Sequence, residues 1–207
     1  MLQLKSIDQD TYFLFKNLVQ KDYLNHFVLA GGTALALQLG HRISIDLDLF
    51  TIREFDSNHL LEQLNADFKV NQASAAKNTL NMFIDYKDQR IKVEFIRHNY
   101  PVIDDFIEED GIRLYSIKDI AAMKLNAIAN RGSKKDFYDL YALLSRYSLV
   151  DLVNFFKNKY QVNNAFTVIK SLTYFADAEL EPDPKSIAPL NWDDVKGKIK
   201  LEVHKCF

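Results

Sequence analysis

Apolar and polar positions follow two different periods along this chain. Up to about residue 112, segments with period-two alternation are interleaved with helical segments, and beyond that point the period is helical. The alternation predicts strands at 45–50, 68–73, 79–86 and 90–97, with a short strand at 26–30 and a hairpin turn at 86–90. Apolar residues at helical spacing predict helices at 8–25, 32–40 and 58–65, and the second is apolar nearly all round and expected to be buried.

The C-terminal part opens with two capping-box patterns, Ser116-x-x-Asp119 and Ser133-x-x-Asp136, each followed by an apolar run. A mixed sheet with helices, followed by helices alone, is typical of the α+β class. The helices expected here lie at 116–130, 133–146, 149–159 and 163–176, with a last short one opening at Trp192.

Length and composition limit the kinds of protein this can be. The 207 residues suffice for one domain or two small ones, and the change of period predicts a core over 1–112 and a helical region over 113–207. The one cysteine, Cys206, excludes an internal disulfide framework and a cysteine-cluster metal site. No apolar run reaches the roughly 18 residues that span a bilayer, and the first residues lack the pattern of a signal peptide. We therefore expect a cytoplasmic protein without a membrane partner.

The charge balance gives no sign of a general nucleic-acid binder. The net charge is −2 and the pI about 6.2, whereas such binders are usually basic. Four cations nevertheless fall within twelve positions, and for Arg131 and Lys134 we favour a solvated helix surface. None of the five histidines has the spacing of a metal-ligand pair, and we interpret them as non-catalytic, with only His41 near the candidate site. The four cations are Lys124, Arg131, Lys134 and Lys135.

Two aspartates one residue apart are the strongest candidates for chemistry. Asp46 and Asp48 alternate with Ile45, Leu47 and Leu49, so the acids share one strand face and the apolar residues point into a core. Their Cα atoms would lie roughly 6–7 Å apart, given a rise of about 3.3 Å per residue. That spacing lets two carboxylates share hard divalent cations, and two such metals can clamp the oxygens of a phosphoryl displacement. An exposed edge strand with polar residues facing water is the structural alternative.

A glycine pair upstream predicts a phosphate site. Gly31 and Gly32 open the helix at 32–40, where backbone N–H groups favour anions and the missing side chains allow close approach. Thr33 either caps that helix or donates its hydroxyl to a phosphate oxygen. Ser44 and Arg42 share the face of the aspartates, where they could bind a phosphate or a metal-bound water. Surface polarity at a strand start is the alternative for both.

These motifs, with two later ones, resemble the AbiEii/AbiGii toxin family of the DNA polymerase β-type nucleotidyltransferase superfamily. The matching segments are Gly31-Gly32-Thr33-Ala34-Leu35, Arg42-Ile43-Ser44-Ile45-Asp46-Leu47-Asp48, Lys124-Leu125-Asn126-Ala127 and Lys135-Asp136-Phe137-Tyr138-Asp139-Leu140. The resemblance covers roughly residues 25–146. It implies a polymerase β-like core with a mixed sheet plus a helical C-terminal subdomain, an NTP substrate and two Mg²⁺ ions.

The resemblance also assigns candidate roles to three further residues. Glu94, in the middle of a strand, is similar to a third carboxylate that reaches the same metals or acts as a base, unless it pairs with Lys92. Lys124 lies inside an apolar helical stripe and is a candidate for reaching the phosphates, or else extends to solvent. Asp136 is a candidate contact to Lys124, the nucleotide sugar or the acceptor, with the Ser133 capping box as its structural alternative.

We therefore expect a metal-dependent nucleotidyltransferase. Asp46, Asp48 and Glu94 bind metal, while Lys124 and the residues at the glycine turn hold the triphosphate. The resemblance implies an acceptor hydroxyl on a tRNA or a protein and a cognate antitoxin, as in a type IV toxin–antitoxin system. Two alternatives stay open: a nucleotide-binding or interaction module without turnover, and a small-molecule nucleotidyltransferase of the antibiotic-modifying kind.

Overall fold

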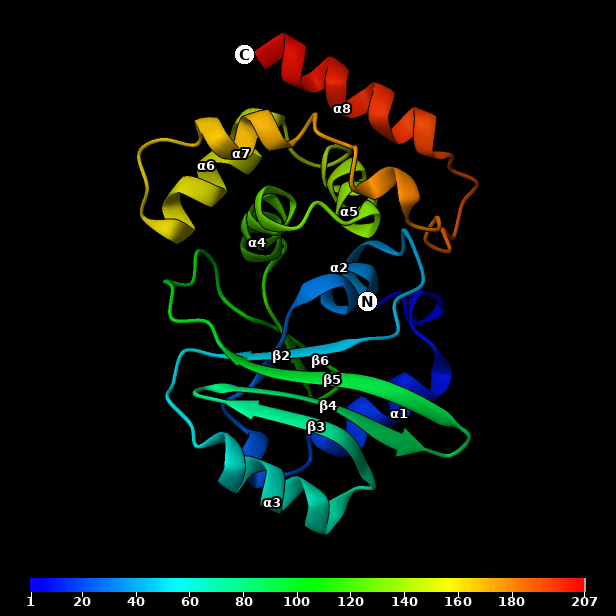
Figure 1. Cartoon of the computed structure of the whole chain (residues 1–207), viewed down its shortest axis with the longest axis vertical. Coiled ribbons are helices and arrows are strands. Elements are labelled where there is room, and N and C mark those ends of the chain that lie inside the picture. The colour runs from blue at the N-terminus through cyan, green and yellow to red at the C-terminus, as the bar shows by residue number, and fades with distance from the viewer. Residues whose placement is uncertain (207) are drawn as a thin grey trace.

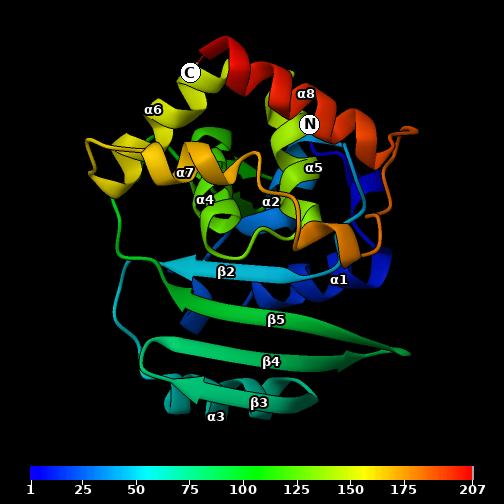
Figure 2. The same cartoon turned by 45° about the horizontal axis from the view of Figure 1, so that its top comes forward.

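A seven-stranded mixed sheet, with helices on either side of it, organises the protein. The computed structural model describes residues 1–206, and Figure 1 shows helices α4 to α8 gathered over one side of the sheet and α3 beneath its β3 end. The strand order is β3-β4-β5-β2-β1-β7-β6, and Figure 2 shows the first four strands of that order side by side. The strands are β1 (Val28–Leu29), β2 (Leu47–Thr51), β3 (Val70–Ala76), β4 (Thr79–Tyr86), β5 (Gln89–Arg97), β6 (Ile107–Glu109) and β7 (Ile112–Leu114). The helices are α1 (Gln9–Leu18), α2 (Gly31–Leu39), α3 (Ser57–Asp67), α4 (Ile117–Asn130), α5 (Lys134–Leu143), α6 (Leu149–Tyr160), α7 (Phe166–Ser171) and α8 (Trp192–Cys206).

The centre of the sheet is the parallel pair β2 and β5. Leu47 lies opposite Val93 and Leu49 opposite Phe95, and all four side chains are buried. Between them, Asp48 lies opposite Glu94 on the other face. The alternation seen in the sequence therefore places an apolar layer on one face of these two strands and acids on the other.

The N-terminal elements differ from expectation at two boundaries. The helix predicted at 8–25 ends at Leu18 and is followed by a separate short 3-10 turn, and β2 begins at Leu47 rather than at Ile45. Ile45 is 58% exposed, so the prediction that it points into the core is wrong. The residues just before β2 form only isolated bridges, and the strict alternation starts where β2 pairs with β5.

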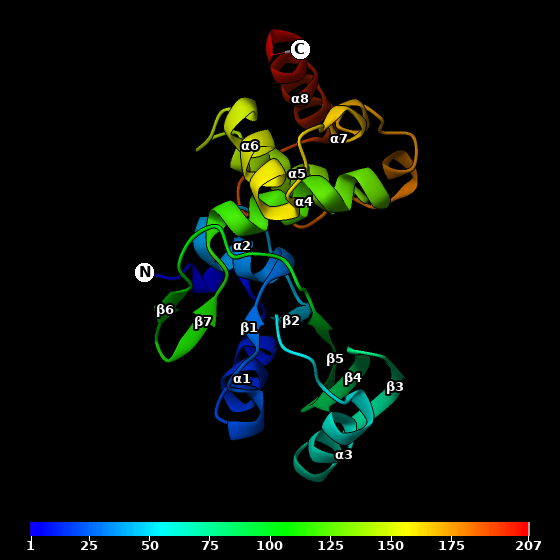
Figure 3. The same cartoon turned by 90° about the vertical axis from the view of Figure 1, so that its left-hand side faces the viewer.

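Helix α2 is buried as predicted, and it lies between the sheet and the C-terminal helices (Figure 3). It begins at Gly31 and ends where Gly40 takes a left-handed φ of 66°. No side chain among residues 1–206 caps its N-terminus. The first N–H groups of the helix, which have no partner within it, therefore depend on other acceptors.

Only one of the two predicted capping boxes caps its helix. Ser116 accepts a hydrogen bond from the Asp119 N–H at the start of α4, whereas the Ser133 hydroxyl donates to Glu181 instead of capping α5. Helix α7 is shorter than predicted, and the last helix, α8, runs for 15 residues rather than being short. Lys134 is buried and pairs with Asp183 at 3.0 Å, so the prediction of a solvated lysine there is wrong.

The apolar interior is continuous from the sheet into the helices. One cluster of buried side chains extends from Leu2 to Ile199, and α4 packs against α2. Strand β7 crosses the predicted boundary after residue 112, and β6 and β7 escaped prediction because each is three residues long. The division into two domains stays a prediction. None of the helices described is long and apolar enough to cross a membrane.

Candidate active site

A pocket of about 340 Å³ lies on the polar face of β2 and β5, beneath α4. Its floor is every second residue of the two strands and of the segments beside them, because successive side chains alternate faces. Its other walls come from the start of α2, from α4 and α5, and from the end of α6. The floor residues are Ser44, Asp46, Asp48, Phe50, Lys92, Glu94, Ile96 and His98.

The three predicted metal-binding carboxylates all line this pocket. Burial and the neighbouring Glu94 carboxylate raise the pKa of Asp48 to about 6. Lys92 contacts Glu94 at 2.7 Å, and Lys135 contacts Asp46 at 3.4 Å. Two lysines therefore partly neutralise the three carboxylates. The negative charge of Glu94 nevertheless disfavours ionisation of Asp48 beside it.

The chemistry of these donors fits a divalent cation. Carboxylate oxygens are the ligands that Mg²⁺ prefers, and a cation would relieve the repulsion that raises the Asp48 pKa. Within residues 1–206, however, the side chains as placed form no group of three or more His, Cys, Asp or Glu arranged to hold a metal. Asp46, in particular, faces Lys135.

The two glycines are required by the side chains that cross in front of them. Gly31 has a φ of +65°, and a Cβ there would lie 1.9 Å from Oδ2 of Asp48. A Cβ on Gly32 would lie 2.3 Å from a guanidinium nitrogen of Arg42. Both contacts are far too short, so only glycine lets the start of α2 lie against these residues. The uncapped helix N-terminus thus lies beside the carboxylates. Its N–H groups are suited to bind a phosphate there.

Thr33 and Ser44 connect α2 to the segment before β2. The buried Thr33 hydroxyl lies 2.8 Å from the Ser44 hydroxyl and also contacts the Asp46 carbonyl. Ser44 lines the pocket, whereas Thr33 is not among its lining residues. Thr33 therefore fixes the backbone that carries Asp46, and its predicted contact with a phosphate stays a prediction.

An ionic network holds three cations that line the pocket, Arg42, Lys124 and Arg131. Arg42 donates two hydrogen bonds to Asp139, at 2.7 and 3.0 Å, and Lys124 contacts Asp136 at 2.9 Å and Asp139 at 2.5 Å. Arg131 adds two contacts to Asp136, at 2.9 and 3.1 Å. Arg42, Lys124, Asp136 and Asp139 are all buried, and the network joins the segment before β2 to α4 and α5.

The charges in this network stabilise one another. Burial raises the pKa of Asp139, but Arg42 and Lys124 outweigh it and hold that pKa well below its usual range. Lys124 and Arg131 likewise lower the pKa of Asp136 against its burial. His41 lies 2.6 Å from Asp139. Lys124 therefore does not extend to solvent, and Asp136 contacts Lys124 rather than closing a capping box.

Several lining residues were not expected from the sequence. His98 lines the pocket, so the prediction that only His41 lies near the site is wrong. Period-two alternation beyond Asp48 and Glu94 would have found Phe50, Ile96 and His98, and helical spacing from Lys124 would have found Ala127 and, three or four residues from it, Met123 and Asn130. Tyr160, which arrives from α6, left no signal in the sequence. The α4 residues missed are Met123, Asn126, Ala127 and Asn130.

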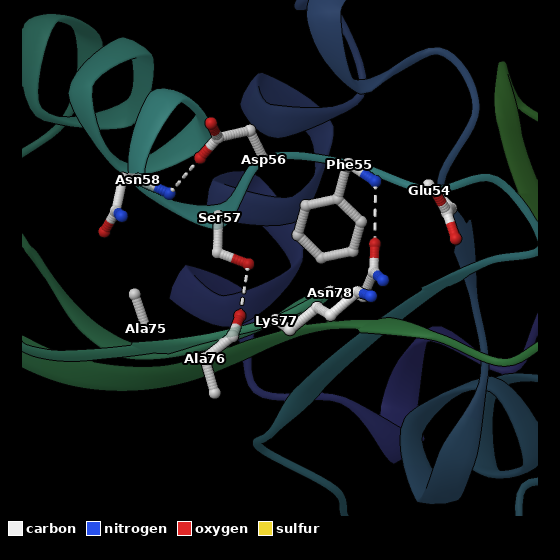
Figure 4. Close-up of a pocket in the computed structure, with 9 residues that line it drawn as sticks. All are labelled: Glu54, Phe55, Asp56, Ser57, Asn58, Ala75, Ala76, Lys77 and Asn78. Atoms are coloured by element: carbon white, nitrogen blue, oxygen red, sulfur yellow. Dashed lines mark hydrogen bonds between the residues drawn. The ribbon is translucent and has the colours of Figure 1, made fainter.

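A second cavity, of about 640 Å³, lies between the start of α3 and the β3–β4 turn (Figure 4). Its polar groups bond to the local backbone: Asp56 caps α3, the Ser57 hydroxyl donates to the Ala76 carbonyl, and Asn78 accepts from the Phe55 N–H. Lys77 is the cation among its lining residues. Neither the glycine turn nor the paired aspartates reach it, so we place the candidate site in the smaller pocket.

Comparisons with known proteins agree with this geometry. The chain is 36% identical over 206 residues to protein aq_aa25 of Aquifex aeolicus (strain VF5), and the match covers 97% of each chain. The crystal structure of JHP933 from Helicobacter pylori superposes with a TM-score of 0.60 at 19% identity, over 97% of this chain and 93% of that one. MenT4, a nucleotidyltransferase toxin of Mycobacterium tuberculosis H37Rv, superposes with a TM-score of 0.53 at 15% identity, over 95% of this chain and 84% of that one. At these identities the two structures establish the fold.

The fold shared with these structures brings a glycine turn against Asp48, one of two aspartates one residue apart, an arrangement suited to binding a phosphate and a divalent cation. The particular family follows from the match of residues 12–205 to the model described as "Nucleotidyl transferase AbiEii toxin, Type IV TA system". The chain belongs to this family of nucleotidyltransferase toxins.

Proposed function

We propose that this protein transfers a nucleoside monophosphate from an NTP to a hydroxyl of a tRNA or a protein, with two Mg²⁺ ions. The observation that carries the proposal is that three carboxylates and an uncapped helix N-terminus line one pocket. The family adds a role as the toxin of a type IV toxin–antitoxin pair, with a cognate antitoxin as its partner.

One set of pocket residues is suited to bind phosphate and another set to bind metal. N–H groups at Gly31 and Gly32 bind phosphate oxygens, with Ser44 beside them. Arg42 and Lys124 line the same space, and the buried aspartates hold both cations in place so that they need not reorganise when a phosphate binds.

Asp46, Asp48 and Glu94 would hold the metal ions. When bound, divalent cations polarise the phosphoryl oxygens and stabilise the charge that develops during displacement. The acceptor oxygen forms a bond to the α-phosphorus while the bond to the β-phosphate oxygen breaks, and pyrophosphate leaves. Glu94 is the candidate base for the acceptor proton, since its carboxylate lies beside Asp48 on the neighbouring strand.

The test is incubation of the purified protein with Mg²⁺, each α-³²P-labelled NTP in turn, total RNA and cell protein. We expect one acceptor class to become labelled. Asp46→Asn/Asp48→Asn should reduce labelling by about 10²- to 10⁴-fold, because a metal clamp contributes several kcal/mol and each 1.36 kcal/mol is tenfold in rate.

Asp88→Asn is the matched control, since Asp88 is exposed in the β4–β5 turn and lines no part of the pocket. Equal labelling by the wild type and the double variant would contradict the proposal. Labelling that needs a small molecule in place of RNA and protein would reassign the acceptor.

A further inference from the structure

The pocket changes chemical character along its length. Charged groups and glycines line the end near Ser44 and Asp46, whereas Phe50, Ile96 and His98 line the floor beyond the acids. Tyr160 and Met123 line the pocket as well. His98 lies four residues past Glu94, a span of about 13 Å at a strand rise of about 3.3 Å per residue.

The rings at this end form a connected aromatic group. The His98 ring lies 5.4 Å from that of Phe50 and 6.0 Å from that of Tyr160, nearly perpendicular to the latter. Tyr100 lies 4.8 Å from His98 and 4.7 Å from Tyr160. Flat, half-buried rings of this kind offer faces and edges on which a planar heterocycle can stack.

Within this group, one buried polar atom has no partner among residues 1–206. Nε2 of His98 is buried and makes no hydrogen bond to the described residues, although it belongs to a residue that lines the pocket. Burial, and then the nearby Lys159 ammonium, lower the pKa of His98 to about 4, so the imidazole is neutral near pH 7. A neutral imidazole nitrogen donates or accepts a hydrogen bond according to its tautomer. A buried atom of this kind is costly unless a ligand completes its bonding.

The other polar groups near this end suit a heterocycle better than an anion. Lys159, whose charge acts on His98, is already engaged by Asp119 at 2.6 Å and by the Pro101 carbonyl. On α4, the Asn130 amide donates to the backbone carbonyl and the side-chain oxygen of Asn126, and both asparagines line the pocket. Uncharged donors and acceptors beside aromatic rings can recognise the edge of a base.

We infer that the aromatic end of the pocket binds the nucleobase of the NTP, with Tyr160 and Phe50 against the ring and Nε2 of His98 bonded to its polar edge. The inference rests on the proposed function, because it needs the triphosphate at the α2 N-terminus and the carboxylates between the two ends. It makes His98 the determinant of nucleotide choice and Tyr160 a stacking residue that supports every base.

The test is equilibrium binding of the four NTPs and of inorganic tripolyphosphate to the full chain with Mg²⁺. His98→Phe keeps a ring of similar size and removes the nitrogen. It should lower the affinity for the preferred NTP at least tenfold relative to the others, with tripolyphosphate binding unchanged within twofold. Tyr160→Leu should weaken all four NTPs about equally and at least tenfold, since stacking tolerates every base.

His59→Phe is the matched control, because His59 lies exposed on α3, away from the pocket. Thermal melting of each variant checks that it is folded, and Tyr160→Leu serves if His98→Phe is not. NTP affinities that stay within twofold of the wild type in both pocket variants would overturn the inference. A pocket variant that binds every NTP like the wild type but binds the RNA or protein acceptor more weakly would assign this end of the pocket to the acceptor. That result would also overturn the inference. A wild type that binds none of the NTPs would instead contradict the proposed function itself.

Discussion

Two groups of carboxylates lie at the candidate site, one lining the pocket and one behind its cations, and they are built in opposite ways. Asp48 and Glu94 stand on β2 and β5 and Asp46 just before β2, with two lysines nearby, and the Asp48 pKa is raised to about 6. Asp136 and Asp139 stand on α5, fully buried, and their pKa values are lowered. The negative charge of the first group is only partly offset by lysines, and that of the second is offset by Arg42, Lys124 and Arg131.

This difference between the two groups distinguishes carboxylates that are suited to bind a ligand from carboxylates that hold the site in shape. A group with excess negative charge is stabilised when a cation binds, so it is suited to metal. A group whose charges are paired and hydrogen-bonded gains nothing further from a cation, and it fixes the side chains that take part in it. The raised pKa of Asp48 and the lowered pKa values of Asp136 and Asp139 therefore support the proposed division between acids that bind a ligand and acids that hold the site in shape.

The largest effect on stability is expected in the supporting group. Asp139→Asn leaves Arg42 and Lys124 buried beside a neutral amide, so the free energy of unfolding should fall by about 3–5 kcal/mol, as when a buried pair loses one partner. Chemical denaturation near pH 7 measures it. Asp46→Asn, which changes a more exposed acid, is the comparison, and an equal loss in both variants would contradict the division of the two groups.

A smaller effect is expected where the glycine turn lies against the ligand-binding group. Gly31→Ala forces a Cβ onto Asp48 at a positive φ, so stability should fall by about 1–3 kcal/mol, and transfer activity with it. Gly197→Ala is the control, because nothing lies within 4 Å of a Cβ there and the site is inside α8. That variant should gain up to about 1 kcal/mol in unfolding free energy. Equal melting temperatures for the two variants would contradict the close packing of Gly31 on Asp48.

A change of the opposite sign, of similar or smaller size, is expected at Asp48. Its pKa is raised from 3.8 to about 6, so the folded state holds the proton more tightly than the unfolded chain. Asp48 therefore costs the folded protein nothing below pH 3.8, and the penalty grows as pH rises from there to about 6. Asp48→Asn should match the wild type near pH 4 and exceed its unfolding free energy by on the order of 1–3 kcal/mol above pH 6.

Denaturation at a series of pH values without divalent metal measures this difference. Asp88→Asn should show no such dependence. A variant that is less stable than the wild type at pH 7 would show that Asp48 is a supporting acid like Asp139.

The smallest effect on stability is expected for the exposed ion pair that joins the helix of the supporting acids to the ligand-binding acids. Lys135 contacts Asp46 at 3.4 Å, and both side chains are substantially exposed, 43% and 33% respectively. Lys135→Gln should therefore change the free energy of unfolding by less than about 1 kcal/mol. The same denaturation series measures it, and a loss comparable to that of Asp139→Asn would place Lys135 in the buried network.

The sequence predicted the central elements well because their patterns are local. Leu47 and Leu49 alternate with Asp48, and the apolar α2 lies between two glycines, so neighbouring residues alone specify both elements. Ile45 follows the same alternation but lies outside the paired strand and is exposed. Strands β6 and β7 are too short to show a period, and their existence depends on pairing with each other and with β1.

By itself, then, the sequence determined the family, the order of the elements and the acids on one face of a strand, because spacing and side-chain chemistry are properties of neighbouring residues. Tertiary structure decided which carboxylates have a raised pKa and which are neutralised by buried cations. Asp136 has the spacing of a capping residue, yet Lys124 and Arg131 reach it from α4 and its end. Tertiary structure also brought together His98, just after β5, and Tyr160, at the end of α6. Desolvation and charge pairing depend on which distant segments pack together, and no local pattern encodes them.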